Sequence, residues 1–216
     1  MMTNYDKQVY MARDLFLNYD QEEMIRKFYL DADETWIRIR MLDRMYRVSR
    51  KSGVIEYQNE IKDTACGENQ NMTEYVECCD YQIVMIIYDV LCYAKQKPVL
   101  AQQWCPVYGL QRTMSSPSAD IFTKRYAEQF SGKCEQLRKA CEKIGGKQPE
   151  NRAGADVCWQ LPAFSFLPVQ FRFWDGDDEF QPKIQLLWDK NTLDYIHFET
   201  TYYVQGHLLE RLAELL

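Results

Sequence analysis

The chain has 216 residues, of which 46% are hydrophobic and 14% aromatic, and its formal net charge is −6. This length and composition supply enough apolar surface for one sizeable core and exclude global disorder. The acidic excess lies in residues 151–216, which hold ten Asp and Glu residues against five Lys and Arg residues. Such a surface repels polyanions, so we expect no nucleic-acid partner.

The N-terminal residues "MMTNYDKQVYMARDLF" carry a charge every few positions and have no apolar stretch of the kind found in a signal peptide. The most apolar run, residues 83–94, contains Asp89 and is shorter than the roughly 20 residues needed to cross a bilayer. The eight cysteines form no C-x-x-C pair, so zinc or iron–sulfur ligation has little support. We expect a cytoplasmic protein with reduced thiols and no membrane contact, and the identity of any cofactor stays open.

The spacing of apolar residues predicts the elements of the first half of the chain. In order, they are helices at 5–19 and 20–29, antiparallel strands at 36–41, 45–50 and 53–58, a long loop at 62–75, and a central helix at 76–94. The second of these helices begins with Asp20 and Glu23, spaced as in a capping box.

The second half begins with an irregular connection that contains Pro and Gly residues. In order, we expect this connection at 96–118, a long helix at 117–144 interrupted at Ser131–Gly132, strands at 157–163, 167–174 and 182–188, an extended piece at 195–198, and a closing helix from Thr200. The whole pattern predicts an α+β fold with a mainly antiparallel sheet covered by two or three long helices. We expect a single domain over residues 1–216, with an internal linker at 145–155.

An acidic loop lies between two runs of alternating apolar residues in "VQFRFWDGDDEFQPKIQLLWDKN", residues 169–191. Its Asp-Gly pair predicts a hairpin turn, and under this interpretation Trp174 and Phe180 pack against the turn while the acids are solvated. A second interpretation is a site for a hard cation such as calcium or magnesium, and a third is a surface for a partner of opposite charge. The acids concerned are Asp175, Asp177, Asp178 and Glu179.

His197 and Glu199 are two residues apart on the expected extended piece, which would place them on one face. Together with the acidic loop they define the alternative hypothesis of a metal-dependent enzyme. The chain has only two histidines, which argues against a multi-His metal centre, and no G-x-S-x-G nucleophile motif is present. We therefore assign no catalytic residue and leave enzymatic activity open.

The first strands carry the main basic concentration of the chain. Its residues are Arg38, Arg40, Arg44, Arg47, Arg50 and Lys51. These side chains could hold a phosphate or an acidic peptide, or they could form a solvated face that neighbouring acids such as Asp43 and Glu56 balance. No glycine-rich phosphate-binding motif supports the first alternative.

The run "LPAFSFLPVQFRFWDGDDEFQPKIQLLWDKN", followed by "HFET", resembles the signature region of an uncharacterised family of bacterial and archaeal proteins, a domain of unknown function. The upstream run "VMIIYDVLCYAKQKPVLAQQWCPV" is similar to the central helix of that family and the Trp-containing turn after it. Some relatives are joined to iron–sulfur domains of the kind seen beside corrinoid proteins in anaerobes, so the resemblance implies a redox or corrinoid context. We expect a non-catalytic binding module or accessory protein that acts on a protein partner or a small cofactor.

Overall fold

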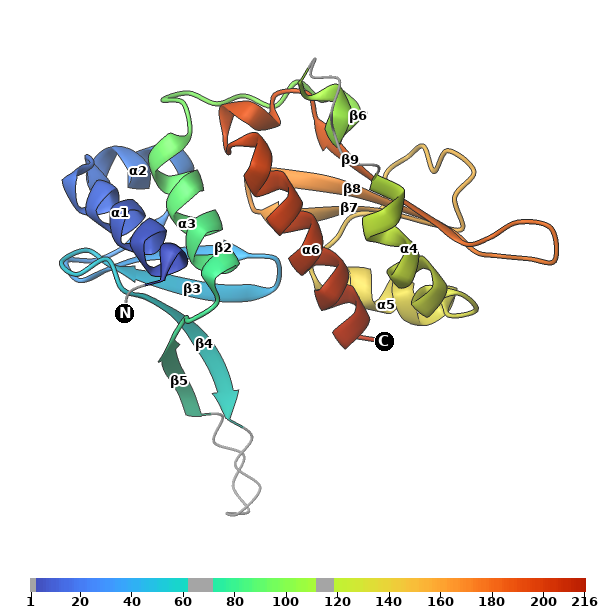
Figure 1. Cartoon of the computed structure of the whole chain (residues 1–216), viewed down its shortest axis with the longest axis horizontal. Coiled ribbons are helices and arrows are strands. Elements are labelled where there is room, and N and C mark those ends of the chain that lie inside the picture. Colours follow the sequence, from blue (N-terminus) through green and yellow to red (C-terminus); the bar gives the residue numbers. More distant parts are fainter. Residues whose placement is uncertain (1–2, 62–71, 112–118) are drawn as a thin grey trace. The chain divides into compact units, whose positions relative to one another are not determined.

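The computed structural model describes residues 3–61, 72–111 and 119–216 (Figure 1). The chain divides into two compact units, Met1–Gln96 and Lys97–Leu216. Residues 145–155 lie inside the second unit, where Lys147 forms a β-bridge with Gln160. The expectation of a single domain with a linker at 145–155 stays a prediction.

The first unit combines three helices with an antiparallel sheet. Its elements are α1 (Asn4–Asn18), α2 (Gln21–Phe28), β1 (Asp31–Ala32), β2 (Trp36–Met41), β3 (Arg44–Ser49), β4 (Ile55–Ile61), β5 (Met72–Glu77) and α3 (Tyr81–Tyr93). Its strands follow the order β5-β4-β3-β2, and β1 pairs with β2. Ile37, Ile39 and Met41, at alternate positions of β2, are buried. The ring of Phe16 in α1 contacts the ring of Tyr88 in α3.

The second unit places three helices against antiparallel strands of its own. Its elements are β6 (Trp104–Pro106), η1 (Val107–Gly109), α4 (Ala119–Phe130), α5 (Cys134–Lys143), β7 (Val157–Phe164), β8 (Leu167–Trp174), β9 (Lys183–Asp189), η2 (Thr192–Asp194) and α6 (Phe198–Glu214). Its strands follow the order β7-β8-β9-β6. Figure 1 shows α6 crossing in front of these strands, and the ring of Phe130 at the end of α4 contacts Phe171 and Phe173 of β8.

These elements confirm the α+β class with mainly antiparallel strands covered by helices. Asp20 caps α2 as predicted, since its carboxylate accepts the N–H of Glu23. The strands expected at 157–163, 167–174 and 182–188 are confirmed to within one residue at each end. Among the described helices, none combines the length and apolarity needed to cross a membrane.

Several boundaries differ from the sequence prediction. Residues 72–77 are a strand, so the expected loop is shorter than predicted at its C-terminal end, and its residues 62–71 lie outside the described residues. The helix expected from residue 76 begins at Tyr81, because the carboxylate of Asp80 accepts the N–H groups of Gln82 and Ile83 as a cap.

The helix expected at 117–144 is two helices, and its residues 117–118 lie outside the described residues. The break follows from Gly132, whose φ of +73° is in the left-handed region and ends α4. The extended piece expected at 195–198 is wrong, because Tyr195 has helical backbone angles after η2 and α6 begins at Phe198.

Candidate functional site

The acidic loop joins β8 to β9 as the hairpin interpretation predicts, and Figure 1 shows it extending beyond the helices of its unit. Asp177 closes the turn with its own side chain. Its Oδ1 accepts the N–H of Glu179 at 2.8 Å and the N–H of Phe180 at 2.7 Å, and its own N–H donates to the carbonyl of Phe180 at 3.0 Å. This carboxylate therefore stabilises the loop that carries it.

Asp175 ties the hairpin to the junction of α4 and α5. Its carboxylate accepts the hydroxyl of Ser131 at 2.8 Å, the N–H of Gly132 at 3.0 Å and the thiol of Cys134 at 3.5 Å. Partial burial acts to raise the pKa of Asp175, but the hydrogen bonds from Gly132 and Ser131 outweigh it and hold the pKa below its usual value. Asp175 thus anchors the hairpin to a segment that lies more than 40 residues earlier in the chain. Gly132, for example, is 43 residues away.

The remaining acids, Asp178 and Glu179, are exposed. In the described ranges, no three His, Cys, Asp or Glu side chains are grouped so that they could hold a metal ion. A cation at this loop would have to draw Asp175 and Asp177 away from the hydrogen bonds that each already accepts. The geometry favours the solvated turn, and the cation and partner-surface interpretations remain untested predictions.

Phe180 does not pack against the turn as expected, because its side chain is 69% exposed. We predict that Phe180→Ala changes the free energy of unfolding by no more than about 0.5 kcal/mol, as for an ordinary surface substitution. Phe173→Ala is the matched control, since Phe173 is fully buried on the adjoining strand, and it should destabilise the protein by about 3 kcal/mol or more. Urea unfolding measures both, and comparable losses in the two variants would contradict the exposed position of Phe180.

His197 and Glu199 lie at the start of α6 and do not share a strand face. His197 is the exposed N-cap residue. Glu199 is exposed in the first turn, where a negative charge is favourable at a helix N-terminus. The expectation that the two share a face of an extended piece is therefore wrong, because the helix starts earlier than the sequence pattern indicates. Their proposed role in a metal-dependent enzyme remains untested.

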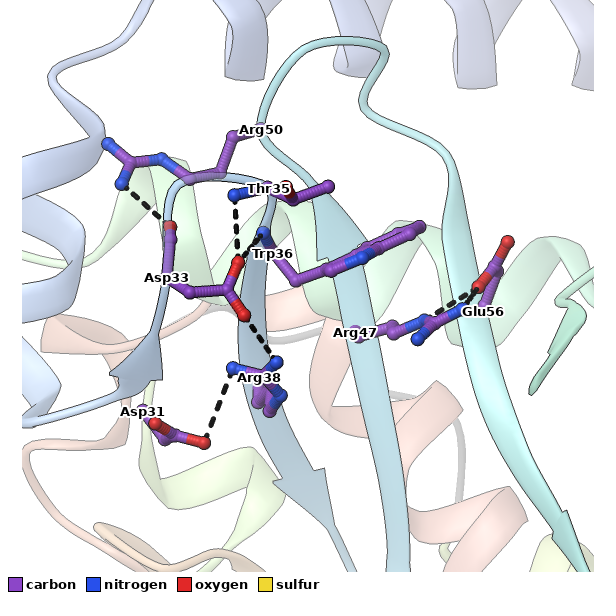
Figure 2. A network of polar contacts seen from close by, with 8 residues as sticks. All are labelled: Asp31, Asp33, Thr35, Trp36, Arg38, Arg47, Arg50 and Glu56. Carbon is purple, nitrogen blue, oxygen red and sulfur yellow. Dashed lines mark hydrogen bonds and ion pairs between the residues drawn. The ribbon is translucent and has the colours of Figure 1, made fainter. Parts of the chain in front are cut away.

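The basic strands of the first unit form a network with acids (Figure 2). Arg38 contacts Asp33 at 2.5 Å and Asp31 at 3.4 Å. Asp33 also accepts the N–H groups of Thr35 and Trp36. The hydrogen bond from Arg38, followed by these two, lowers the pKa of Asp33 to about 2.

Two further arginines of this network also have acidic partners. Arg47 contacts Glu56 at 2.5 Å, and its guanidinium lies 4.0 Å from the ring centroid of Trp36 and 3.7 Å from that of Tyr75. Arg50 contacts Glu22 at 2.5 Å. At these arginines the structure supports the interpretation of a basic face whose charge is balanced by acids, since each guanidinium group already contacts a carboxylate.

A pocket of about 340 Å³ in the first unit offers a different kind of site. It lies among residues of α1, α3, the start of β4 and the end of β5. Four tyrosines contribute to its wall: Tyr5, Tyr10, Tyr81 and Tyr88. Val9, Ile55 and Val84 supply apolar surface. An apolar cavity with a few polar groups is the usual form of a small-molecule site.

Arg13 is held in this pocket by a chain of contacts. Its Nε donates to the hydroxyl of Tyr88 at 3.4 Å, and that hydroxyl donates to the carbonyl of Gly53 at 2.5 Å. Gly53 has a φ of +73°, and a Cβ at this position would lie 2.7 Å from Cγ of Arg13. Glycine therefore permits both the turn between β3 and β4 and the close approach of the arginine stem. Burial raises the pKa of Tyr88, so its hydroxyl stays protonated and able to donate.

Cys78 and Cys79 also line the pocket. Burial, the largest influence, raises the pKa of the Cys78 thiol to about 11, so the nucleophilic thiolate is scarce at neutral pH. Cys79 is exposed. The pocket thus has the shape and the hydrogen-bonding groups for binding, without an activated nucleophile at Cys78.

A second pocket, of about 300 Å³, lies in the second unit beside the base of the acidic hairpin. Thr123, Ala127 and Ile184 line it, together with the exposed Lys124 and Lys183. Lys124 lies 4.0 Å from Glu128 on the same helix, so part of its charge is balanced. Its two lysines are exposed, whereas Arg13 is half-buried, so the tyrosine-lined pocket is the stronger candidate.

The model of the domain of unknown function DUF3786 matches residues 20–211. The chain belongs to this family. This finding confirms the expected resemblance to a domain of unknown function. No curated protein and no solved structure matches the chain. The DUF3786 match includes the acidic hairpin and α3, whereas α1, which carries Arg13, precedes it.

Proposed function

We propose that this protein is a non-catalytic binding module of the cytoplasm that takes a small cofactor or metabolite into the tyrosine-lined pocket. The observation that carries the proposal is Arg13, fixed by Tyr88 and Gly53 at the wall of a cavity of about 340 Å³. A polar group that the fold holds in place is ready to bind without a large entropic cost.

The state of the cysteines supports a reducing compartment. The seven cysteines in the described part of the chain, Cys78 to Cys158, are free thiols. Secreted proteins of this size commonly contain disulfides, whereas cytosolic proteins keep their thiols reduced. This observation favours the cytoplasmic location within the proposal.

The size of the pocket limits the ligand. Ligand pockets range from about 300 to 1,000 Å³, so a pocket near the lower end suits a molecule of one or two rings and not a whole corrin macrocycle. The redox or corrinoid context implied by the family resemblance limits the proposal to a small ligand from that metabolism. The protein serves that metabolism by binding a small metabolite and not by enclosing a corrinoid.

Recovery of the natural ligand tests the proposal. Tagged wild-type protein, purified gently from its source cells and then denatured, is expected to release one small molecule in near-stoichiometric amount, detected by mass spectrometry. Val9→Trp should lose that molecule, because the indole ring would fill part of the pocket that Val9 lines.

Val99→Trp is the matched control, since Val99 is 67% exposed and lies outside the pocket. It should retain the ligand, and melting curves establish that both variants are folded. Wild-type protein that releases no small molecule, or a Val9→Trp variant that retains it, would overturn the proposal.

A further inference from the structure

We propose that the pocket ligand carries an aromatic ring and an oxyanion, either carboxylate or phosphate, and that Arg13 binds the oxyanion. This inference rests on the proposed function of the same pocket and names the chemical class of its ligand. It depends on three features of the lining: the free donors of Arg13, the engagement of a nearby acid and the exposure of two tyrosine rings.

The donors of Arg13 are the first feature. Its side chain is half-buried, and Nε is directed to Tyr88. In the part of the chain that the structure describes, neither Nη atom has a hydrogen-bond partner and the guanidinium has no ion pair. This contrasts with Arg38, Arg47 and Arg50 of the same unit, each of which contacts a carboxylate. A planar guanidinium with both Nη groups available matches the two oxygens of a carboxylate or phosphate.

In the described part of the chain, no ion pair joins this guanidinium to Asp6 or Glu77, the two acids of the pocket wall. Asp6 accepts both the N–H and the hydroxyl of Thr3 at 2.8 Å, in the capping box of α1. These hydrogen bonds hold the pKa of Asp6 below its usual value and keep its carboxylate at the helix start. Glu77 is exposed at the end of β5 and forms no ion pair with Arg13 within the described residues.

The tyrosines select the rest of the ligand. The rings of Tyr5 and Tyr81 meet edge to face, with centroids 4.8 Å apart. The side chains of Tyr5 and Tyr10 remain 64% and 63% exposed, although both line the pocket. Aromatic surface left open beside a cavity gains from covering by another ring, since aromatic pairs attract beyond the burial of their area. A flat ring with an oxyanion at one end would satisfy both the tyrosines and Arg13.

Three probes that share one ring but differ in charge test the inference. Indole-3-acetate carries a carboxylate, indole-3-acetamide is its neutral counterpart, and tryptamine is a cation. We expect calorimetry to show that the acetate binds wild-type protein about tenfold more tightly than the amide, as a charge-assisted pair implies. Tryptamine should bind most weakly.

Arg13→Met keeps an unbranched stem against Gly53 and should bind the acetate and the amide equally. Arg13→Lys keeps the charge without the fork and should show an intermediate preference. The matched control is Arg26→Met on the exposed side of α2, which should bind as wild type does. Melting curves verify that each variant is folded.

Equal binding of acetate and amide to wild-type protein, or tightest binding of tryptamine, would overturn the inference while leaving a pocket that binds small molecules. Absence of binding by all three probes would overturn the proposed ligand class. The ligand-recovery experiment with Val9→Trp would then test the proposed function separately. A preference for acetate that survives in Arg13→Met would assign the oxyanion to another residue.

Discussion

Replacing Asp189 by Ala is expected to lower the free energy of unfolding by about 3 kcal/mol, since its charge-assisted hydrogen bonds are lost from a buried position. The side chain is 1% exposed, at the end of β9. Its carboxylate accepts the N–H of Ala101 at 2.8 Å, the N–H of Gln102 at 2.7 Å and the N–H of Asn191 at 2.8 Å. Removal would leave three backbone donors without this acceptor, in a loop where Gln102 has a φ of +56°.

Urea unfolding measures the loss, with Asp178→Ala as the matched control. Asp178 is an exposed acid of the same unit, so its removal should change stability by no more than about 0.5 kcal/mol. Asp189→Asn keeps one acceptor oxygen and should fall between the two. A loss below about 1 kcal/mol in Asp189→Ala would show that the loop does not depend on this carboxylate.

Phe130→Ala is expected to lower the free energy of unfolding by about 4 kcal/mol, because it opens a cavity in the core of the second unit. The side chain is fully buried at the end of α4. Its ring centroid lies 6.4 Å from that of Phe171 and 6.3 Å from that of Phe173, both in edge-to-face geometry. The lost contacts therefore include aromatic pairs as well as buried area.

Phe122→Ala is the control from the same helix, because the side chain of Phe122 is 43% exposed. Phe122→Ala should lower the free energy of unfolding by less than about 1.5 kcal/mol, since this side chain buries less apolar area on folding. Chemical unfolding gives both values. Equal losses in the two variants would contradict the assignment of Phe130 to the core.

The sequence predicts the α+β class and most element positions because the alternating and helical periods are strong in this chain. Ile37, Ile39 and Met41 alternate toward the core, and the prediction of their strand is confirmed. The boundaries that fail depend on single residues. Asp80 delays the start of α3, and Gly132 divides the helix expected at 117–144, and neither effect changes the apolar period.

The site was much less predictable than the fold. Arg13 donates to Tyr88, which lies 75 positions later, and Tyr88 donates to Gly53, which lies 35 positions before Tyr88. In the sequence, Arg13 is one charge on an amphipathic helix and carries no motif. The acids at 175–179 suggest a shared site because they are close in sequence. The carboxylate of Asp175, however, is directed to Ser131, 44 residues away. Such pairings arise from tertiary packing, which a local pattern does not contain.

The tyrosine rings of the pocket report directly where the ligand binds. In protein labelled with ¹³C at its tyrosine rings, addition of the small-molecule extract of the source cells is expected to shift the resonances of Tyr5, Tyr10, Tyr81 and Tyr88, which line the pocket. Tyr195 and Tyr203, which lie in the second unit, should not respond. No change at the four pocket tyrosines, or changes confined to the second unit, would contradict ligand binding in this pocket.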